Sequence, residues 1–241
     1  MKKIIAIGCL LIFIALGNVY AQKKVAVVTF YINKQIDVKD FGGAAYLAVT
    51  KLGDDPAFNL SPLLKEFHAQ FFDTYANDFP FQLLTEKEVV NNAAYKAFTP
   101  NGVATSGILN VDNFLTPAEG YKVLLPELTS GNENEMLKIF SGVDGIMKVY
   151  IDFKLVKIGL GGMGVVKVQA RTNIILYNKN GDKVFSTTED AKSKGVSPMV
   201  GGLPVMTTDK IMPMCESALN ELMINLQKDM AKMIKKADAK L

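Results

Sequence analysis

The sequence is poor in the side chains that most catalytic and metal sites need. It has no tryptophan, a single histidine, His68, and a single arginine, Arg171. No cluster of histidine and cysteine has the spacing of a zinc site, and neither a Walker loop nor a G-x-S-x-G nucleophile motif occurs. Because arginine is the preferred side chain for bidentate contacts to phosphates and base edges, nucleic acid is not an expected partner. We predict no catalytic residue, no cofactor and no metal site.

Long apolar runs are also scarce, and the one at the start of the chain predicts export. Two lysines, an apolar run over residues 4–16 and small residues ending at Ala21 form the pattern of a secretory signal peptide. The run is shorter than the roughly 20 residues of a permanent membrane anchor. We therefore expect residues 1–21 to be removed and the chain to act in the periplasm, at the outer membrane or outside the cell. Lipid attachment at Cys9 is the less favoured alternative, because only a few apolar residues precede this cysteine.

The mature chain, residues 22–241, is predicted to form one domain with its own core. It keeps 25 basic and 24 acidic residues, a net charge of +1. Cys215 is its only cysteine, so no internal disulfide can stabilise it, and we expect this thiol to be a buried apolar group. Its apolar runs are shorter than a membrane helix, and we expect a soluble or peripheral protein.

The first half of the mature chain alternates strand and helix patterns. Residues 24–32 are β-branched and aromatic almost throughout, which is typical of a strand buried on both faces of a sheet. Residues 35–62 lack clear periodicity and predict a long loop or a short irregular excursion. A helix is expected from Ser61, and Thr85 starts a capping box that predicts a further helix to about residue 97. Two more capping boxes, at Thr116 and Ser130, predict a helical insertion over about residues 116–142.

From residue 145 the hydrophobic period changes from that of a helix to that of a strand. Apolar residues alternate with polar ones over residues 147–155 and again over 166–176, which predicts two long antiparallel strands. An Asn-Gly turn and a third strand from Val184 follow, and the chain closes with a long helix from about Asp209. The predicted fold class is α/β (α+β): a mixed sheet with a three-stranded antiparallel part, flanked by helices, with a long C-terminal helix.

The stretch GLGGMG at residues 159–164 has the spacing of a dinucleotide-binding loop, but its context differs. Such a loop follows a strand and opens a helix, whose N-terminus holds the pyrophosphate. Here strands are predicted on both sides, and the acidic residue about 20 positions on, Asp182, falls in a polar turn. We interpret the stretch as a hairpin tip that projects Leu160 and Met163.

A second apolar stretch, residues 195–206, resembles the hairpin tip in composition. It carries Met199, Val200 and Leu203 among small residues. Together with Leu160 and Met163 these are the predicted partner-binding residues, since two apolar loops can form one exposed contact surface. The alternative is that the two loops pack on each other.

Several segments also match a known domain family in pattern. They are KVAVVTF, the helix from Leu63 to Asn77, FQLLTEKEVVNN, VDGIMKVYIDFKL and the hairpin VVKVQARTNIILYNKNGDKVFSTTEDAKSKG, about half of the mature chain. They resemble the periplasmic domain shared by the curli secretion lipoprotein CsgG, the penicillin-binding-protein activator LpoB and the N-terminal domain of TolB. The resemblance implies an envelope role, and some members form secretion pores by extending hairpins through the outer membrane. Residues 159–164 are too short to add such a hairpin, whose strands need about 9–11 residues each, so a member that forms no pore fits better.

These patterns predict a non-enzymatic envelope protein that works in binding, assembly or secretion through protein–protein contacts. Its expected partner is an envelope protein, with peripheral outer-membrane contact and oligomer formation left open. Two alternatives remain: a carrier of a small ligand or lipid, which needs an apolar cavity, and a carboxylate-dependent hydrolase. The hydrolase requires separated carboxylates or His68 to converge in one pocket, whereas the default for His68 is a partly buried structural residue.

Overall fold

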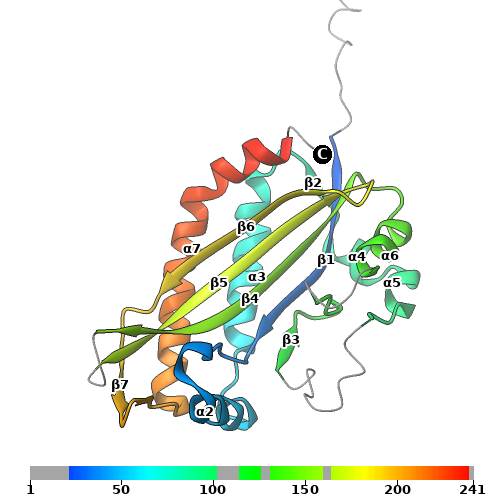
Figure 1. The fold of residues 1–241 in the computed structure, drawn as a ribbon. Coiled ribbons are helices and arrows are strands. Elements are labelled where there is room, and N and C mark those ends of the chain that lie inside the picture. The colour runs from blue at the N-terminus through cyan, green and yellow to red at the C-terminus, as the bar shows by residue number, and fades with distance from the viewer. Residues whose placement is uncertain (1–21, 102–113, 126–130, 160–163, 239–241) are drawn as a thin grey trace, which may run out of the picture.

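The computed structural model describes residues 22–101, 114–125, 131–159 and 164–238, with side chains as far as Met230. Its centre is an open mixed sheet in the order β2-β1-β4-β5-β7-β8 (Figure 1). β3 pairs with the same edge of β1 as β2 does, and β6 pairs with the same edge of β5 as β7 does. The predicted class, a mixed sheet with flanking helices and a long C-terminal helix, is confirmed.

β1 (Lys24–Asn33) is the buried strand that the sequence predicts. Its residues 25–32 are all buried, and it runs parallel to β4 (Gly145–Ile158) and to β2 (Gln82–Leu83). The long β-branched run fits this position because both faces of the strand lie inside the protein. β1 therefore lies between β2 and β4, and β4 follows it in the chain by more than 100 residues.

β4, β5 (Val165–Asn178) and β6 (Lys183–Lys192) form the predicted antiparallel part of the sheet. The alternation in the sequence separates its two faces, because successive side chains of a strand point to opposite sides. The apolar positions of β4 and β5 are buried on one face, where Phe30 of β1 also contacts Phe67 and Phe71. The helices α3 (Ser61–Asp73) and α7 (Thr208–Asp238) cover this face, behind the sheet in Figure 1.

α7 is the long closing helix of the sequence prediction. Its buried stripe packs on β5 and β6 and consists of Ile211, Met214, Cys215, Ala218, Leu219, Leu222, Leu226 and Met230. The Tyr75 hydroxyl donates a hydrogen bond of 2.8 Å to the Met223 carbonyl and so ties the helix to the segment after α3. Cys215 is fully buried, as predicted, and burial raises the pKa of its thiol.

Shorter elements pack around the β1 edge of the sheet and cover part of its other face. α4 (Glu86–Val90) begins at the predicted capping box of Thr85, while α5 (Ala93–Ala97) is a separate helix with Asn92 as its cap. α6 (Asn132–Ile139) is the helix predicted from the box at Ser130. The buried Tyr95 of α5 holds this layer on β1, because its hydroxyl donates to the Val28 carbonyl and accepts from the Lys122 amide, both at 2.8 Å.

α6 is attached to the sheet by a buried ion pair. Lys148 of β4 is fully buried, and its Nζ lies 2.5 Å from Oε1 of Glu133 and 3.5 Å from the Leu125 carbonyl. Burial lowers the pKa of Lys148, while the contact with Glu133 opposes that shift. The pair therefore ties α6 to the first part of β4.

The sequence predictions for residues 35–62 and for Thr116 are wrong. Residues 35–62 are not a loop throughout: η1 (Lys39–Phe41) leads into α2 (Gly43–Asp54), a helix with Ala45, Val49 and Leu52 buried. The helical spacing of its apolar residues is short and lies between Gly42-Gly43 and Asp55-Pro56, which are typical of loops, so the sequence pattern did not reveal the helix. The box at Thr116 does not start a helix, because β3 (Leu115–Pro117) pairs with the free end of β1 and this pairing overrides the local cap signal.

The second apolar stretch folds as a hairpin rather than a loop. β7 (Ser197–Val200) and β8 (Leu203–Pro204) are antiparallel, joined by Gly201 and Gly202 with positive φ. Two-residue turns that match the twist of a hairpin require positive φ, which glycine adopts without strain. The short 3-10 helix η2 (Tyr75–Asp78) completes the elements. Among the described residues, no helix is long and apolar enough to cross a membrane.

Candidate functional site

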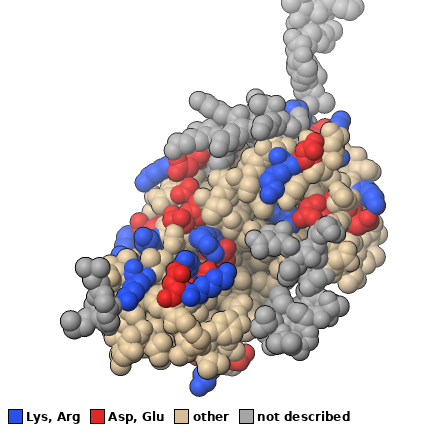
Figure 2. Space-filling model, viewed as in Figure 1, with Lys and Arg blue, Asp and Glu red and all other residues tan. Residues whose placement is uncertain are grey.

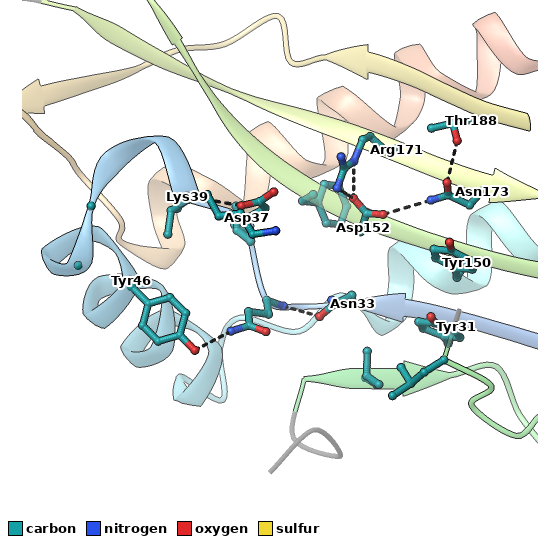
Figure 3. Close-up of a pocket in the computed structure, with 18 residues that line it drawn as sticks. Tyr31, Asn33, Asp37, Lys39, Tyr46, Tyr150, Asp152, Arg171, Asn173 and Thr188 are labelled. Carbon is teal, nitrogen blue, oxygen red and sulfur yellow. Dashed lines mark hydrogen bonds and ion pairs between the residues drawn. The ribbon is translucent and has the colours of Figure 1, made fainter. Parts of the chain in front are cut away.

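A polar groove of about 920 Å³ lies on the face of the sheet that α3 and α7 leave uncovered (Figure 3). Its floor is formed by β1, β4 and β5, and its sides by the segment 33–46 and by Leu115 of β3. The volume is in the range of ligand sites in proteins. We call this site the groove; its lining includes Tyr31, Asn33, Gln35, Asp37, Lys39, Tyr46, Tyr150, Asp152, Arg171, Asn173 and Thr188.

One row of groove side chains crosses the sheet from β1 to β6. The strand register places Tyr31 beside Tyr150, Tyr150 beside Asn173 and Asn173 beside Thr188. The two tyrosine rings stack with centroids 5.3 Å apart and planes 7° apart. Burial, with smaller contributions from Tyr150 and Asp152, raises the pKa of Tyr31, so its hydroxyl stays neutral at physiological pH.

The next position along β4 and β5 holds an ion pair. Oδ1 of Asp152 lies 2.6 Å from Nε and 2.5 Å from Nη2 of Arg171, while Oδ2 accepts a 3.2 Å hydrogen bond from the Asn173 amide. The Thr188 hydroxyl donates to Oδ1 of Asn173 at 2.8 Å, which continues the chain of contacts to β6. Burial raises the pKa of Asp152, although Arg171 and Asn173 act in the opposite direction. Both carboxylate oxygens are thus engaged as acceptors.

The segment that leads to α2 forms the opposite side of the groove and is anchored to β4. The Asp37 amide donates to the Phe153 carbonyl at 2.8 Å, and the Leu155 amide donates to the Asp37 carbonyl at 2.9 Å. Nζ of Lys154 also contacts Asp40 at 3.0 Å. These contacts place the Asp37 side chain in the same groove as Asp152, and Asp37 contributes to the raised pKa of Asp152.

The groove is polar but carries no net formal charge. Asp37 and Asp152 are balanced by Lys39 and Arg171, and the amides of Asn33, Gln35 and Asn173 can both donate and accept hydrogen bonds. Such a lining suits a ligand with amides or hydroxyls more than a phosphate, which needs uncompensated positive charge. Among the described residues, no group of three or more histidine, cysteine or carboxylate side chains is placed to hold a metal ion.

A second surface lies next to the groove, at the end of the sheet that carries α2 and β7. Six of the seven large apolar side chains exposed in the described residues belong to α2, to the end of β4 or to the β7–β8 hairpin. These elements adjoin, because β4 pairs with β5, β5 with β7, and α2 contacts β8. We call this surface the apolar end: Tyr46, Leu47, Ile158, Val196, Val200 and Leu203. Figure 2 shows that the surface over α2 is mostly uncharged.

The predicted partner-binding residues divide between this surface and other places. Val200 and Leu203 are 68% and 40% exposed, and the hairpin register sets them side by side. Met199 is half-buried and packs against the core. Leu160 and Met163 lie outside the described residues. The glycine stretch does join two antiparallel strands, so the hairpin interpretation is confirmed and the dinucleotide-loop context is absent there.

His68 has the structural environment that the sequence predicts. Its ring packs on Phe30 and Phe72, its side chain is 20% exposed, and Nε2 lies 2.6 Å from Oε1 of Glu86. The nearby Tyr121 hydroxyl is buried, and burial, with a smaller contribution from Glu86, raises its pKa. His68 does not line the groove.

Sequence reasoning missed the groove entirely. Its residues come from β1, β3, β4, β5, β6, α2 and the segment before α2, and the polar ones on the strands occupy ordinary outward positions. One signal was present: Tyr150, Asp152, Arg171 and Asn173 stand at outward positions, where lysine, threonine or glutamate is more usual, and Arg171 is the only arginine of the chain.

Comparisons with known proteins give no family. No family model and no curated protein matches the chain. Among solved structures it is similar to a protein from Helicobacter pylori described as a neuraminyllactose-binding hemagglutinin homolog, with 8% identity and a TM-score of 0.37 over 92% of this chain and 91% of that one. It is also similar to a lipoprotein from Neisseria meningitidis, with 13% identity and a TM-score of 0.31 over 87% of this chain and 99% of that one. At these scores the likenesses assign no function.

Proposed function

We propose that this chain is an exported, non-enzymatic envelope protein that binds a partner protein through the apolar end. The observation that carries the proposal is the concentration of six exposed apolar side chains on three adjoining elements. Single exposed apolar residues are normal on soluble proteins, whereas contiguous groups mark interaction surfaces. Export is supported by the signal-peptide pattern of residues 1–21.

The β7–β8 hairpin is the element most suited to this contact. The Gly201–Gly202 turn places Val200 and Leu203 opposite each other at its tip. Met199 packs inward and supports the hairpin, so the exposed pair is held in position before a partner arrives. The resemblance of the sequence patterns to the domain of CsgG, LpoB and TolB agrees with an assembly role.

The proposal can be tested by photo-crosslinking in native envelopes. A photoreactive residue replaces Val200 in one variant and Ile224 in another; Ile224 is the seventh exposed apolar residue and lies on α7, away from the apolar end. We expect a crosslinked protein from position 200 and none from position 224. Adding Leu203→Ser should abolish the product without changing the unfolding midpoint, since surface substitutions cost little stability.

Light scattering after size exclusion separates the other outcomes. The mature chain is run alone and with liposomes made from native envelope lipids. A fraction bound to liposomes that is lost in the Val200→Ser/Leu203→Ser variant would assign the apolar end to the membrane and contradict the protein partner. Equal crosslinking from positions 200 and 224 would also contradict the proposal.

A carboxylate-dependent hydrolase is the second candidate, because Asp37 and Asp152 line one groove and the pKa of Asp152 is raised. The contacts of Asp152 with Arg171 and Asn173 use both its oxygens as acceptors, which does not suit a proton donor. A panel of chromogenic esters and glycosides tests this candidate. Hydrolysis that is lost in Asp152→Asn and kept in Asp73→Asn, a control at the exposed end of α3, would support it.

The carrier alternative has less support. Lipids and other apolar ligands need an enclosed apolar cavity, whereas the groove is open and mixes amides, carboxylates and phenols with apolar side chains. Native mass spectra that show lipid bound to the purified mature chain would support the carrier alternative.

A further inference from the structure

We infer that the groove binds an extended polypeptide segment of the same partner protein that contacts the apolar end. The inference rests on the proposed function, because it takes the partner to be a protein. It adds a second contact of different chemistry: the apolar end is covered by apolar surface, and the groove receives a short stretch of chain.

The two surfaces are continuous. Tyr46 lines the groove and is also one of the exposed residues of the apolar end, and its hydroxyl accepts a hydrogen bond of 3.3 Å from the Gln35 amide. Figure 3 shows Tyr46 on α2, at the side of the groove opposite to Asn173 and Thr188. A partner seated on α2 and the β7–β8 hairpin therefore has its chain next to the entrance of the groove.

The groove concentrates the residue types that dominate protein interfaces. Its lining includes the only arginine of the chain and three of its eight tyrosines. Tyrosine and arginine are enriched where binding energy concentrates, because each combines a large contact area with hydrogen-bonding capacity. Of these residues, Tyr46, Tyr150 and Arg171 retain exposed surface that a ligand can reach.

The polar groups match a peptide backbone in kind and in charge. The amides of Asn33, Gln35 and Asn173 each use at least one polar atom in a contact within the protein. Because a side-chain amide has two N–H groups and two oxygen lone pairs, each keeps further donor and acceptor capacity for the N–H and C=O of a peptide unit. Since the charged residues of the groove balance, the preferred segment carries no strong net charge. Lys39 at the rim is exposed and can meet one carboxylate of the segment.

The dimensions indicate the length of the segment. The row from Tyr31 through Tyr150 and Asn173 to Thr188 spans four neighbouring strands. At about 4.8 Å between strands, this row is about 14 Å long, the reach of about four residues of extended chain. The hydrogen bonds from Asp152 through Asn173 to Thr188 already fix these side chains, so binding orders little that is mobile.

The test uses a displayed library of short random linear peptides, selected on the mature chain and measured by fluorescence polarisation. Thr188→Lys adds bulk and charge to an exposed residue of the groove, and the matched control is Ser186→Lys, which is exposed on the same face of β6 but outside the groove. We expect selected peptides to bind the wild-type chain and Ser186→Lys equally, and Thr188→Lys at least about tenfold more weakly, a loss of about 1.4 kcal/mol.

A second pair of variants blocks the groove by volume alone. Gly43 lines the groove, a Cβ there meets no atom within 4 Å, and its backbone is helical, so Gly43→Phe adds a large ring to the groove lining without a clash at Cβ. Gly142→Phe is the control, since Gly142 also has free space and lies outside the groove. We expect Gly43→Phe to lose peptide binding and Gly142→Phe to keep it.

The results also separate this inference from the proposed function. Peptides that no longer bind Thr188→Lys but still bind Val200→Ser/Leu203→Ser support the groove as a site of its own. Failure to select any peptide, or peptides that ignore both groove variants, overturns the inference, while crosslinking from position 200 still supports the apolar end. Binding of a neutral oligosaccharide panel at the groove, with no peptide binding, also overturns it.

Discussion

The buried pair between Lys148 and Glu133 gives the sharpest prediction about stability. Glu133→Ala leaves the Lys148 amine fully buried with the Leu125 carbonyl, 3.5 Å away, as its remaining contact. Removing one partner of a buried ion pair typically costs about 3–5 kcal/mol, because the other charge stays buried without compensation. We expect a loss of this size in the free energy of unfolding at neutral pH.

The matched control is Glu135→Ala in the same helix turn. Glu135 pairs with Lys138 at 2.6 Å, but the two side chains are 45% and 72% exposed. Both glutamates lie in the first turn of α6 and so share the same helix-dipole effect. An exposed pair contributes about 0–1 kcal/mol, so this variant should remain close to wild type.

The pH dependence distinguishes a buried charge from lost packing. Burial lowers the pKa of folded Lys148 below its value of 10.5 in the unfolded chain. Between these two values the unfolded state holds a proton that the folded state lacks, so the stability of Glu133→Ala should rise with pH, by up to about 1.4 kcal/mol per pH unit. In the wild type, Glu133 opposes the lowering and the rise should be smaller.

Urea unfolding followed by circular dichroism, from about pH 6 to about pH 9, measures these effects. A Lys148→Met/Glu133→Leu variant should recover stability near or above that of the wild type, since apolar replacements of a buried pair are often neutral or stabilising. Equal losses in Glu133→Ala and Glu135→Ala, or a loss in Glu133→Ala that does not change with pH, would refute the reasoning.

Three further predictions concern single positions. Tyr95→Phe removes the hydroxyl that satisfies two buried backbone groups, and we expect a loss of about 1–3 kcal/mol in urea unfolding. Gly120→Ala should lower the free energy of unfolding by a similar amount, because φ at Gly120 is +80° and the new Cβ would lie 2.9 Å from the Val90 side chain. Its control, Gly142→Ala, has free space around the new Cβ and should stay within about 0.5 kcal/mol of wild type. Burial raises the pKa of Cys215, so a thiol reagent should react with the mature chain only after unfolding, and rapid labelling of the native protein would contradict this.

The sequence predicted the parts of the fold that depend on local periodicity. The alternation over 147–155 and 166–176 identified β4 and β5 and their two faces, and the Asn-Gly turn identified the start of β6. The box at Thr85 placed the start of α4 correctly because a capping box satisfies helix amides by contacts within four residues. The same signal failed at Thr116, where a free strand edge of β1 was available for pairing.

The groove could not be predicted because no local pattern encodes it. Tyr31 and Tyr150 become neighbours only through the parallel pairing of β1 with β4, and Asp37 lines the same groove as Asp152 only because the chain after β1 continues alongside β4 in the same direction. Strand register between distant segments decides these contacts, and a single sequence does not state it. The apolar end was predicted in part, since Val200 and Leu203 were named, while Tyr46 and Leu47 depended on the missed helix α2.

The parallel pairing of β1 with β4 also sets the order in which the protein can fold. β4, β5 and β6 follow one another in the chain and can pair by short-range hairpin contacts, whereas β1 waits for a partner far along the chain, as the hydrogen bond from the Lys24 amide to Asp144 across 120 residues illustrates. β1 is therefore synthesised before the strand with which it pairs. Its run VAVVTFYI is apolar and rich in β-branched residues, the kind of segment that pairs with other chains when it is left exposed. The least protected stage in the life of this protein is therefore the interval between the emergence of β1 and the arrival of β4.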